Sequence, residues 1–283
     1  MFHKIKLFFE LIKFEHTVFA LPFAYLGMLL AGHSWPGFIL FFLITVAMVS
    51  ARTAGMTLNR VIDLNIDRDN PRTKTRPILT GHFSLRSAWI AAAVSSLIFI
   101  ISAFLLNPLC FKLSFITIFL LSSYHYVKRF SFLCHFALGL VLAIAPMGGW
   151  IAVTGRFSWA PVPLSLAVLF WVAGFDIIYS LQDRDFDKSY GLHSIPVKFG
   201  QAGALRLSAY CHAATAVFLG LFGWAGHLGF VYAAGVVVCA ILLWLEHRLL
   251  ADSNLDKINT AFFTINGWVG ILLLVFTFLD IYR

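Results

Sequence analysis

Charge is what this sequence has least of. Only 12% of its 283 residues are charged and 13 are acidic, whereas 60% are hydrophobic and 30 are phenylalanines. A water-soluble domain of this length could not stay in solution with that balance, because it would have too few polar side chains to cover its surface. The composition therefore indicates an integral membrane protein.

Cysteine is also scarce, and the spacing that would make it informative is missing. The four cysteines stand singly: Cys110, Cys134, Cys211 and Cys239. Neither a disulfide framework nor a zinc-type pair is present, so we expect these thiols to pack as small apolar groups. The histidines show no metal-ligand pattern either, and no function is assigned to His82, His125, His135 or His193.

Long apolar stretches are what the chain does contain. A helix needs about 20 residues to cross a hydrocarbon core. Nine stretches meet this length, at residues 14–32, 38–60, 87–106, 109–127, 132–154, 160–182, 204–226, 228–249 and 260–280. They lack the alternation of a strand barrel, and lipid offers the backbone no hydrogen-bonding partner. We therefore expect an all-α fold with nine transmembrane helices in a single domain, residues 1–283.

The first thirteen residues have a different pattern. Residues 1–13 place their apolar side chains on one stripe of a helix and most of their charged ones elsewhere. The stripe consists of Phe2, Ile5, Phe8, Phe9 and Ile12. This pattern is typical of a short interfacial helix. A signal peptide is disfavoured, because the following apolar run is too long and lacks a convincing cleavage site.

The basic residues predict how the chain is oriented. If the N-terminus is cytoplasmic, all but four of the 21 lysines and arginines fall on the cytoplasmic side; the exceptions are Arg52, Lys112, Arg156 and Arg283. Short loops rich in lysine and arginine stay in the cytoplasm. The net charge of +8 is thus a topology signal first, and also favours anionic headgroups or phosphate-bearing substrates rather than nucleic acid. We expect a bacterial inner membrane protein embedded in lipid.

Two acidic motifs occupy the longest cytoplasmic loops and the helices that enter them. In NRVIDLNIDRDNPRTKTRP, residues 59–77, the first acidic motif is Asn59, Asp63 and Asp67. In FDIIYSLQDRDFD, residues 175–187, the second acidic motif is Tyr179, Asp183 and Asp187, and Asp176 lies about one turn ahead. Residues four apart share a helix face. The same spacing at the same membrane level predicts that the two motifs face one cavity.

Four converging carboxylates would repel one another and would need a cation. Oxygen ligands beside phosphate favour Mg²⁺, which uses one or two carboxylates together with substrate phosphates. The predicted ligands are Asp63, Asp67, Asp183 and Asp187, with Asn59 beside them. The alternative is that each aspartate is a solvated charge paired with a nearby base, and this is our expectation for Asp69 and Asp185, which lie off the shared face.

Basic side chains near both motifs suit the same chemistry, because a diphosphate carries oxygens that arginine and lysine neutralise. The first loop supplies Arg72, Lys74 and Arg76, and the stretch SSYHYVKR places Tyr124 and Lys128 four apart. The alternative for Lys128 is an ordinary positive-inside anchor flanked by interfacial tyrosines.

Taken together, these motifs resemble one family over nearly the whole chain. N-R-x-x-D-x-x-x-D, then N-P-R-T-x-x-R-P, Y-x-x-x-K and D-x-x-Y-x-x-x-D-x-x-x-D, with GLHSIPVKFG closing the second loop, resemble the UbiA family of intramembrane prenyltransferases. The resemblance implies helices around a central cavity that opens to lipid. It also implies a cytoplasmic cap formed by residues 63–86 and 183–203.

The resemblance also implies roles for individual residues. Asn59, Asp63 and Asp67 would hold one Mg²⁺-diphosphate, and Asp183 and Asp187 the second metal. Tyr124, Lys128, Arg72 and Arg76 would contact the diphosphate, Tyr179 would contact substrate, and Asp176 would lie near the acceptor. The implied reaction moves a polyprenyl group from a polyprenyl diphosphate to an aromatic ring in ubiquinone or menaquinone biosynthesis. Phe175 and Trp171 are candidates to line the prenyl tunnel.

The acceptor is less defined than the donor. The first apolar stretch begins KFEHTVFALPFAY, whereas 4-hydroxybenzoate members of the family usually have a motif such as R-x-D-K-P-I-G. This start resembles a branch found in menaquinone synthesis by the futalosine route. Glu15 and His16 are candidates to bind an aromatic acid, although a polar pair at a helix start is the more ordinary interpretation. A naphthoate, haem or chlorophyll-type acceptor stays open.

A different class of protein also fits part of the pattern. Carboxylates inside a membrane bind the coupling ions of secondary transporters. Against this, the acids gather at one membrane face, and no pair of broken helices marks the midplane.

Overall fold

Apolar stretches become helices throughout the part of the chain that the structure describes. The structure is a computed structural model that describes residues 8–9, 11–12, 17–32, 34–250, 258 and 264–283. Every regular element among these residues is helical, so the all-α prediction is confirmed for them. Glu15, His16 and most of the predicted interfacial helix lie outside the described residues.

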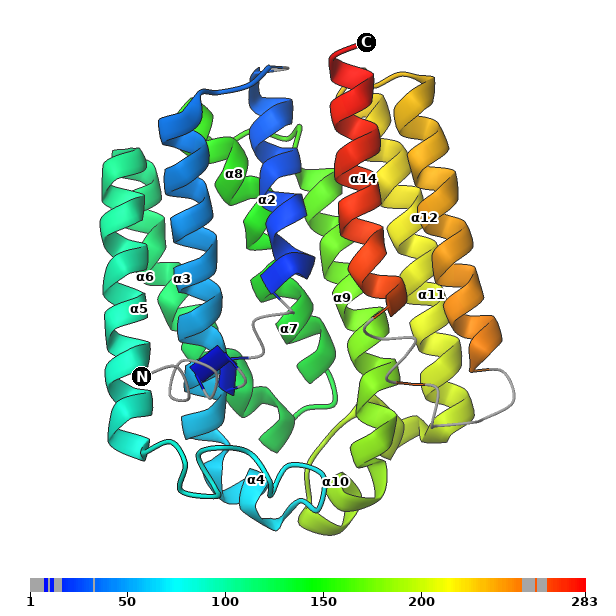
Figure 1. Ribbon diagram of the computed structural model, residues 1–283. Coiled ribbons are helices and arrows are strands. Elements are labelled where there is room, and N and C mark those ends of the chain that lie inside the picture. Colours follow the sequence, from blue (N-terminus) through cyan, green and yellow to red (C-terminus); the bar gives the residue numbers. More distant parts are fainter. Residues whose placement is uncertain (1–7, 10, 13–16, 33, 251–257, 259–263) are drawn as a thin grey trace.

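The helices follow one another as hairpins (Figure 1). Their bounds are α2 Thr17–Gly32, α3 Phe38–Ile62, α4 Leu64–Asp69, α5 Leu85–Leu106, α6 Pro108–Ser123, α7 Cys134–Leu142, α8 Ile144–Thr154, α9 Val162–Ser180, α10 Arg184–Tyr190, α11 Ile195–Ala225, α12 Phe230–Leu249 and α14 Asn266–Ile281. Two short 3-10 helices, η2 Tyr124–Arg129 and η3 Leu181–Asp183, extend α6 and α9.

Within the described part of the chain, seven helical segments are long and apolar enough to cross a membrane. They are Phe38–Ile62, Leu85–Leu106, Pro108–Arg129, Cys134–Thr154, Val162–Tyr190, Ile195–Ala225 and Phe230–Leu249. The other two expected spans correspond to α2 and α14, which have 16 residues each among the described residues. Both lie within the same bundle as the long helices (Figure 1).

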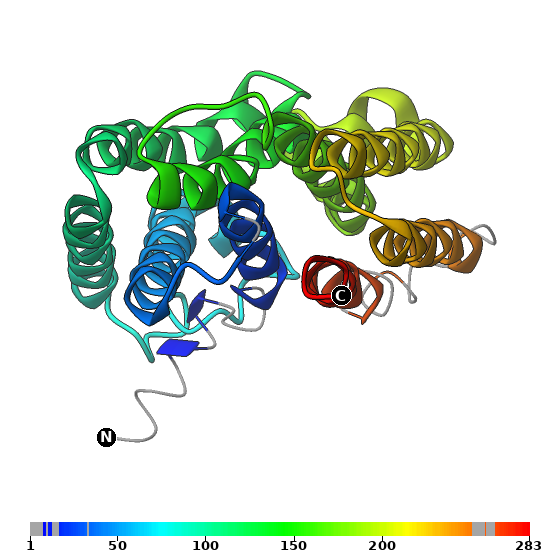
Figure 2. The same ribbon diagram turned by 90° about the horizontal axis from the view of Figure 1, so that it is seen from above.

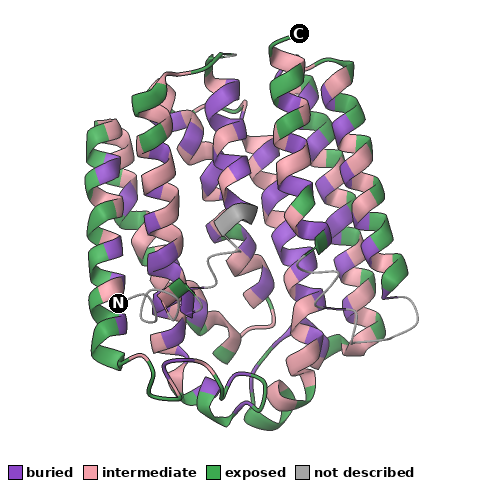
Figure 3. Ribbon diagram, viewed as in Figure 1, coloured by how far each residue is buried: buried purple, intermediate pink, exposed green. Residues whose placement is uncertain are grey.

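Neighbouring helices close a ring when the bundle is viewed from above (Figure 2). Going round it, α2 contacts α3, α3 contacts α6, and α6 leads through α7 to α9; α9 then packs on α11, α11 on α12, α12 on α14, and α14 returns to α2. Helix α5 packs on the outside against α3 and α6. Its exposed residues include the large apolar Trp89, Ile90 and Phe104, and Figure 3 colours much of this helix as exposed. An exposed apolar face of this extent indicates contact with lipid.

Two local features change the expected helix boundaries. The expected span 132–154 is divided at Ala143, because Pro146 has no N–H and its ring crowds the carbonyl of Leu142 one turn back. The expected loop 183–203 is mostly helical: α10 fills its first part, and α11 begins at Ile195. Ser194 caps α11 by accepting a hydrogen bond from the Val197 N–H at 3.4 Å.

Both predicted cap segments nevertheless lie at one end of the bundle. The segment between α3 and α5 contains α4 and a series of turns, and the segment between α9 and α11 contains η3 and α10. Figure 1 shows α4 and α10 together at the lower end. The described part of the N-terminal segment lies there too, because Leu11 accepts a hydrogen bond from Arg60 of α3 at 3.2 Å.

Helices α2 and α8 approach each other through glycines. A Cβ atom added to Gly27 would fall on the carbonyl oxygen of Pro146, and one added to Gly149 on the carbonyl oxygen of Ala24. Small residues allow helix backbones in lipid to pack this closely. In contrast, a Cβ at the adjacent Gly148 would meet open space.

This contact predicts different effects for two neighbouring substitutions. Gly149→Ala should lower the unfolding midpoint of the detergent-purified protein by about 3 to 10 °C, because the added methyl group forces α2 away from α8. The control Gly148→Ala should leave the midpoint unchanged or slightly higher, since alanine favours a helix over glycine by about 1 kcal/mol. Equal midpoints for the two variants in a thermal melt would contradict the glycine contact.

Candidate active site

A polar cavity of about 440 Å³ lies at the end of the bundle that carries α4 and α10. Helix α3 ends there, η2 brings in the end of α6, and α9 continues through η3 into α10. Ten of the eleven predicted site residues line this cavity: Asn59, Asp63, Arg72, Arg76, Tyr124, Lys128, Asp176, Tyr179, Asp183 and Asp187. The two acidic motifs, more than a hundred residues apart in the sequence, therefore face one space through all their members except Asp67.

Asp63 sits at the break between α3 and α4 and is only 2% exposed. Its Oδ2 accepts hydrogen bonds from Lys128 Nζ at 2.7 Å and from Asn59 Nδ2 at 3.0 Å. Its Oδ1 is buried and accepts no hydrogen bond from the described residues, with Arg129 Nη2 3.7 Å away. A buried carboxylate oxygen without a donor is a ready ligand for a cation.

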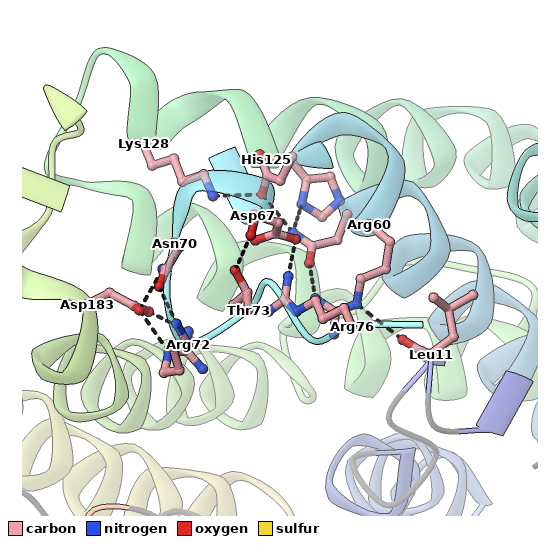
Figure 4. Close-up of polar contacts among 12 residues, drawn as sticks. Leu11, Arg60, Asp67, Asn70, Arg72, Thr73, Arg76, His125, Lys128 and Asp183 are labelled. Carbon is pink, nitrogen blue, oxygen red and sulfur yellow. Dashed lines mark hydrogen bonds and ion pairs between the residues drawn. The ribbon is translucent and has the colours of Figure 1, made fainter. Parts of the chain in front are cut away.

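Asp67 does not line the cavity, although we predicted that it faces the same space as Asp63. Its backbone N–H still bonds to the Asp63 carbonyl at 2.8 Å, so the four-residue spacing is kept through the helix break. However, the carboxylate forms an ion pair with Arg76 of the following loop, and Thr73 Oγ1 donates to the Asp67 carbonyl at 2.8 Å (Figure 4). The Asp67 side chain thus fixes the loop in this state.

Asp183 joins the two loops. Its Oδ1 accepts hydrogen bonds from Arg72 Nε at 2.8 Å and Asn70 Nδ2 at 2.9 Å, and its Oδ2 pairs with Arg72 Nη2 (Figure 4). Arg72 Nη1 also donates to the Tyr179 hydroxyl at 3.1 Å. Burial lowers the pKa of Arg72, but the hydrogen bonds and attraction of Asp183 and Tyr179 outweigh it and raise the pKa above its ordinary value. Arg72 therefore remains a fixed cation at the cavity rim.

Asp187 and Asp176 complete the acidic wall. Asp187, on α10, is half-buried, lines the cavity and forms no ion pair with the described residues. Asp176, on α9, pairs with the buried His135, whose Nδ1 lies 2.7 Å from Asp176 Oδ2. The predicted solvent charges behave as expected: Asp69 is exposed, and the Asp185 side chain is 96% exposed beside Arg184.

Four residues that the sequence analysis left without a role contact the predicted site. His125 Nδ1 lies 3.1 Å from Asn59 Nδ2, Arg60 Nη1 donates to Asn59 Oδ1 at 3.0 Å, and Asn70 and His135 bind Asp183 and Asp176. Arg60 and Asn70 were visible within the first motif, and His125 stands between Tyr124 and Lys128. His135 offered no such signal, because its partner comes from another helix.

A second cavity of about 450 Å³ adjoins the polar one and is almost wholly apolar. Arg52, Tyr124 and Leu142 line both cavities, so the two spaces meet at these side chains. Most of the second cavity is walled by alanine, glycine, leucine and isoleucine, and we call it the apolar chamber.

The aromatic lining predicted for the tunnel is only partly present. Phe175 lies on the polar cavity. Trp171 lines neither cavity: it is 1% exposed, packs against Phe23 and Phe175, and donates a hydrogen bond to Asn266 Oδ1 at 2.8 Å. Its expected role in the tunnel is therefore wrong, because the indole faces the core between α9, α2 and α14.

The donor set fits a magnesium ion that shares its ligands with a phosphate. Among the described residues, no three histidine, cysteine or acidic side chains are arranged as a ready-made metal site. Mg²⁺ does not need such a cage, since one or two carboxylates with water and phosphate oxygens suffice. The unbonded oxygen of Asp63 and the unpaired carboxylate of Asp187 are available for this on the two sides of the cavity.

Known proteins share both the sequence and the fold. The profile of the UbiA prenyltransferase family matches residues 20–268. A 4-hydroxybenzoate octaprenyltransferase of Methylobacillus flagellatus is 31% identical over 252 residues, which cover 88% of this chain and 83% of the relative. The apo structure of a UbiA homologue from Aeropyrum pernix K1 is 38% identical, covers 94% of this chain and 98% of its own, and has a TM-score of 0.86.

A more distant structure shares the fold. It is a UbiA homologue from Archaeoglobus fulgidus bound to GPP and Mg²⁺, 19% identical, covering 98% of this chain and 100% of its own, with a TM-score of 0.68. The family match over most of the chain removes the secondary transporter that the buried carboxylates had left open. The chain belongs to the UbiA prenyltransferase family and is a membrane-embedded prenyltransferase.

Proposed function

We propose that this enzyme transfers a polyprenyl group from a polyprenyl diphosphate to an aromatic acid, with 4-hydroxybenzoate as the first candidate, in quinone biosynthesis. The observation that carries this proposal is the junction of the acid-rich polar cavity with the apolar chamber. The polar cavity suits a metal-bound diphosphate, and the chamber suits a hydrocarbon chain. The relatives named 4-hydroxybenzoate octaprenyltransferase support the choice of substrates.

The acidic and basic residues of the cavity have different roles in binding the polyprenyl diphosphate. Asp63 and Asn59 on one side, and Asp183 and Asp187 on the other, are placed to hold Mg²⁺, with Asp67 supporting the first loop through Arg76. When bound, Mg²⁺ supplies positive charge that stabilises the departing diphosphate. Lys128 and Arg72 neutralise the remaining phosphate charge, and Tyr124 and Arg76 lie on the same wall.

The walls of the site protect the reactive allylic carbon of the prenyl chain from water. Departure of the diphosphate leaves an allylic cation, which water would destroy. The apolar chamber keeps water away from the chain, and the ring faces of Tyr124 and Phe175 can stabilise the cation by cation–π attraction. The electron-rich ring of the acceptor then forms the new carbon–carbon bond, and the proton on that ring carbon is lost to the released diphosphate or to water, which restores the aromatic ring.

Loss of the acids should stop the reaction without unfolding the protein. Asp63→Ala and Asp183→Ala should each lower prenyl transfer by about 100-fold or more, because the charge on the leaving diphosphate is no longer balanced. Chelation of Mg²⁺ should do the same to the wild type. The measurement is mass spectrometry of the product from octaprenyl diphosphate and 4-hydroxybenzoate in membranes. Asp185→Ala, an exposed neighbour, should stay within about twofold; undiminished transfer by both test variants would defeat the site assignment.

Arg52 supports an acceptor that carries an anionic group. It lies in α3 where the polar cavity meets the apolar chamber, and its Nε is buried with no hydrogen-bond partner among the described residues. A buried N–H group without an acceptor is unfavourable, and arginine binds carboxylates through two parallel hydrogen bonds. We infer that Arg52 binds the carboxylate of the aromatic acid.

Replacing this arginine should change which acceptor is used. Arg52→Met should raise the KM for 4-hydroxybenzoate by about 10- to 100-fold, the loss of a hydrogen bond to a charged group. It should leave the KM for the methyl ester of the same acid nearly unchanged. Arg206→Met, on the exposed face of α11, serves as the control. Equal losses for the acid and the ester in steady-state assays would contradict the role of Arg52.

We also propose that the chain is a single domain with nine membrane crossings and that the cap faces the cytoplasm. The lysine and arginine distribution and the gathering of both acidic loops at one end of the bundle support this orientation. It places α2 and α14 as the two short crossings, with the N-terminus on the same side as the cap.

Single cysteines in a background without the four native ones test the orientation. Asp69→Cys, exposed on α4, should react with an impermeant thiol reagent only from the cytoplasmic side of inner-membrane vesicles. Trp159→Cys, which replaces an 86% exposed residue between α8 and α9, should react only from the opposite side. The reverse labelling pattern would show that the chain is inserted the other way.

A further inference from the structure

His135 connects three helices at the wall of the polar cavity. It is the second residue of α7, is 2% exposed, and lines the cavity together with Asp176 of α9. Its Nδ1 lies 2.7 Å from Asp176 Oδ2. Its Nε2 accepts a hydrogen bond from the backbone N–H of Ile195, at the start of α11, at 3.3 Å. Figure 1 shows α7 and α9 side by side, and the two helices are in contact.

The Ile195 contact determines where the imidazole carries its proton. An N–H group can only donate, so Nε2 must present a lone pair to it. The proton of the neutral imidazole is then on Nδ1, where it is donated to the Asp176 carboxylate. This tautomer is assigned from the hydrogen-bond pattern. One oxygen of Asp176 is thereby occupied and its orientation is fixed.

The second oxygen of Asp176 is left for a ligand. Oδ1 forms no hydrogen bond with the described residues, and the side chain is 26% exposed on the cavity wall. A carboxylate that is held through one oxygen by an imidazole N–H is the arrangement by which proteins aim an acidic group at a substrate or metal. An aromatic acceptor with a hydroxyl group has a donor of the right kind for Oδ1.

The backbone next to His135 is attached to the donor side of the site. The N–H of His193 donates to the carbonyl of Lys128 at 2.8 Å, and Cys134 Sγ lies 3.5 Å from the carbonyl of His193. Lys128 pairs with Asp63. The segment before α11 therefore contacts both Lys128, which pairs with Asp63, and Cys134, the neighbour of His135.

We propose that His135 is a positioning residue that orients Asp176 so that its free oxygen accepts a hydrogen bond from the hydroxyl group of the aromatic acceptor. A hydroxyl held by a carboxylate gains phenolate character, which makes the ring carbon beside it more nucleophilic. This inference rests on the proposed function and assigns a role to a histidine that does not touch either substrate.

Two substitutions separate this role from a merely structural one. His135→Asn can still donate a hydrogen bond to Asp176 from near the position of Nδ1, but it cannot reach Ile195. His135→Gln can still accept from the Ile195 N–H near the position of Nε2, but it loses Asp176. A helix-capping role predicts that Gln is the better replacement, whereas positioning of Asp176 predicts that Asn is.

The experiment measures steady-state kinetics of the full-length enzyme in membranes with octaprenyl diphosphate and 4-hydroxybenzoate. We expect His135→Gln to lower kcat/KM for the acceptor by about 10- to 100-fold with little change in the KM for octaprenyl diphosphate. His135→Asn should retain most of the activity. In an Asp176→Asn background, His135→Gln should add little, because both substitutions remove the same interaction. His82→Leu, an exposed histidine on the first loop, should match the wild type.

The possible outcomes distinguish a failure of the proposed function from a failure of the inference about His135. A wild-type enzyme that transfers no prenyl group to 4-hydroxybenzoate removes the proposed function and this inference with it. Transfer by the wild type, with His135→Gln as active as His135→Asn or with fully additive losses in the Asp176→Asn background, overturns the inference alone. A thermal melt of each purified variant shows whether a loss of activity reflects unfolding. If it does, the ratio of the acceptor KM to the donor KM in the remaining folded enzyme shows whether the defect is specific to the acceptor.

Discussion

A carboxylate buried beside lipid has to be matched by a cation or by several hydrogen-bond donors, and this requirement organises the loop end of the molecule. Asp63 is matched by Lys128, Asp67 by Arg76 and Asp183 by Arg72. Each pair joins segments that are distant in the chain or lie on opposite sides of a turn. The same ion pairs that make the acids tolerable at this depth therefore also fold the two loops over one cavity.

These pairs explain why the site is built on rigid ends of helices rather than on loops alone. Asp63 follows the last turn of α3, Lys128 lies on η2, and Asp183 ends η3. Arg72, Arg76 and Asn70 come from the intervening loop, and Asp67 and Asp183 hold them in place. A helix end sets the position of an acid to within a fraction of a turn, and the loop supplies the basic residues that complete the arrangement.

The sequence was sufficient for the helices and for most of the site, because both depend on short-range spacing. Apolar runs of span length leave lipid-embedded helices as the one solution, and residues four apart stay together even through the break at Asp63. The sequence was insufficient where a partner comes from another helix. The direction of Asp67, the core position of Trp171, and the contacts of His125 and His135 all depend on side chains that no local pattern identifies. The boundaries at Ala143 and Ile195 were within reach, since Pro146 and Ser194 are visible signals.

The pairing of acids with bases in the resting site has a consequence for the order of events. Arg72 occupies both oxygens of Asp183, so this pair must separate before Asp183 can ligate a metal and Arg72 can bind a phosphate, whereas Asp63 keeps Oδ1 free beside Lys128. A cation alone would pair with the acids and leave the basic side chains without a counter-charge. An anion alone would pair with the basic side chains and leave the acids without one. Only a particle that brings both signs of charge at once lets every partner be exchanged without leaving an unmatched group. We therefore expect these ion pairs to favour binding of the complete metal–diphosphate over binding of either ion alone.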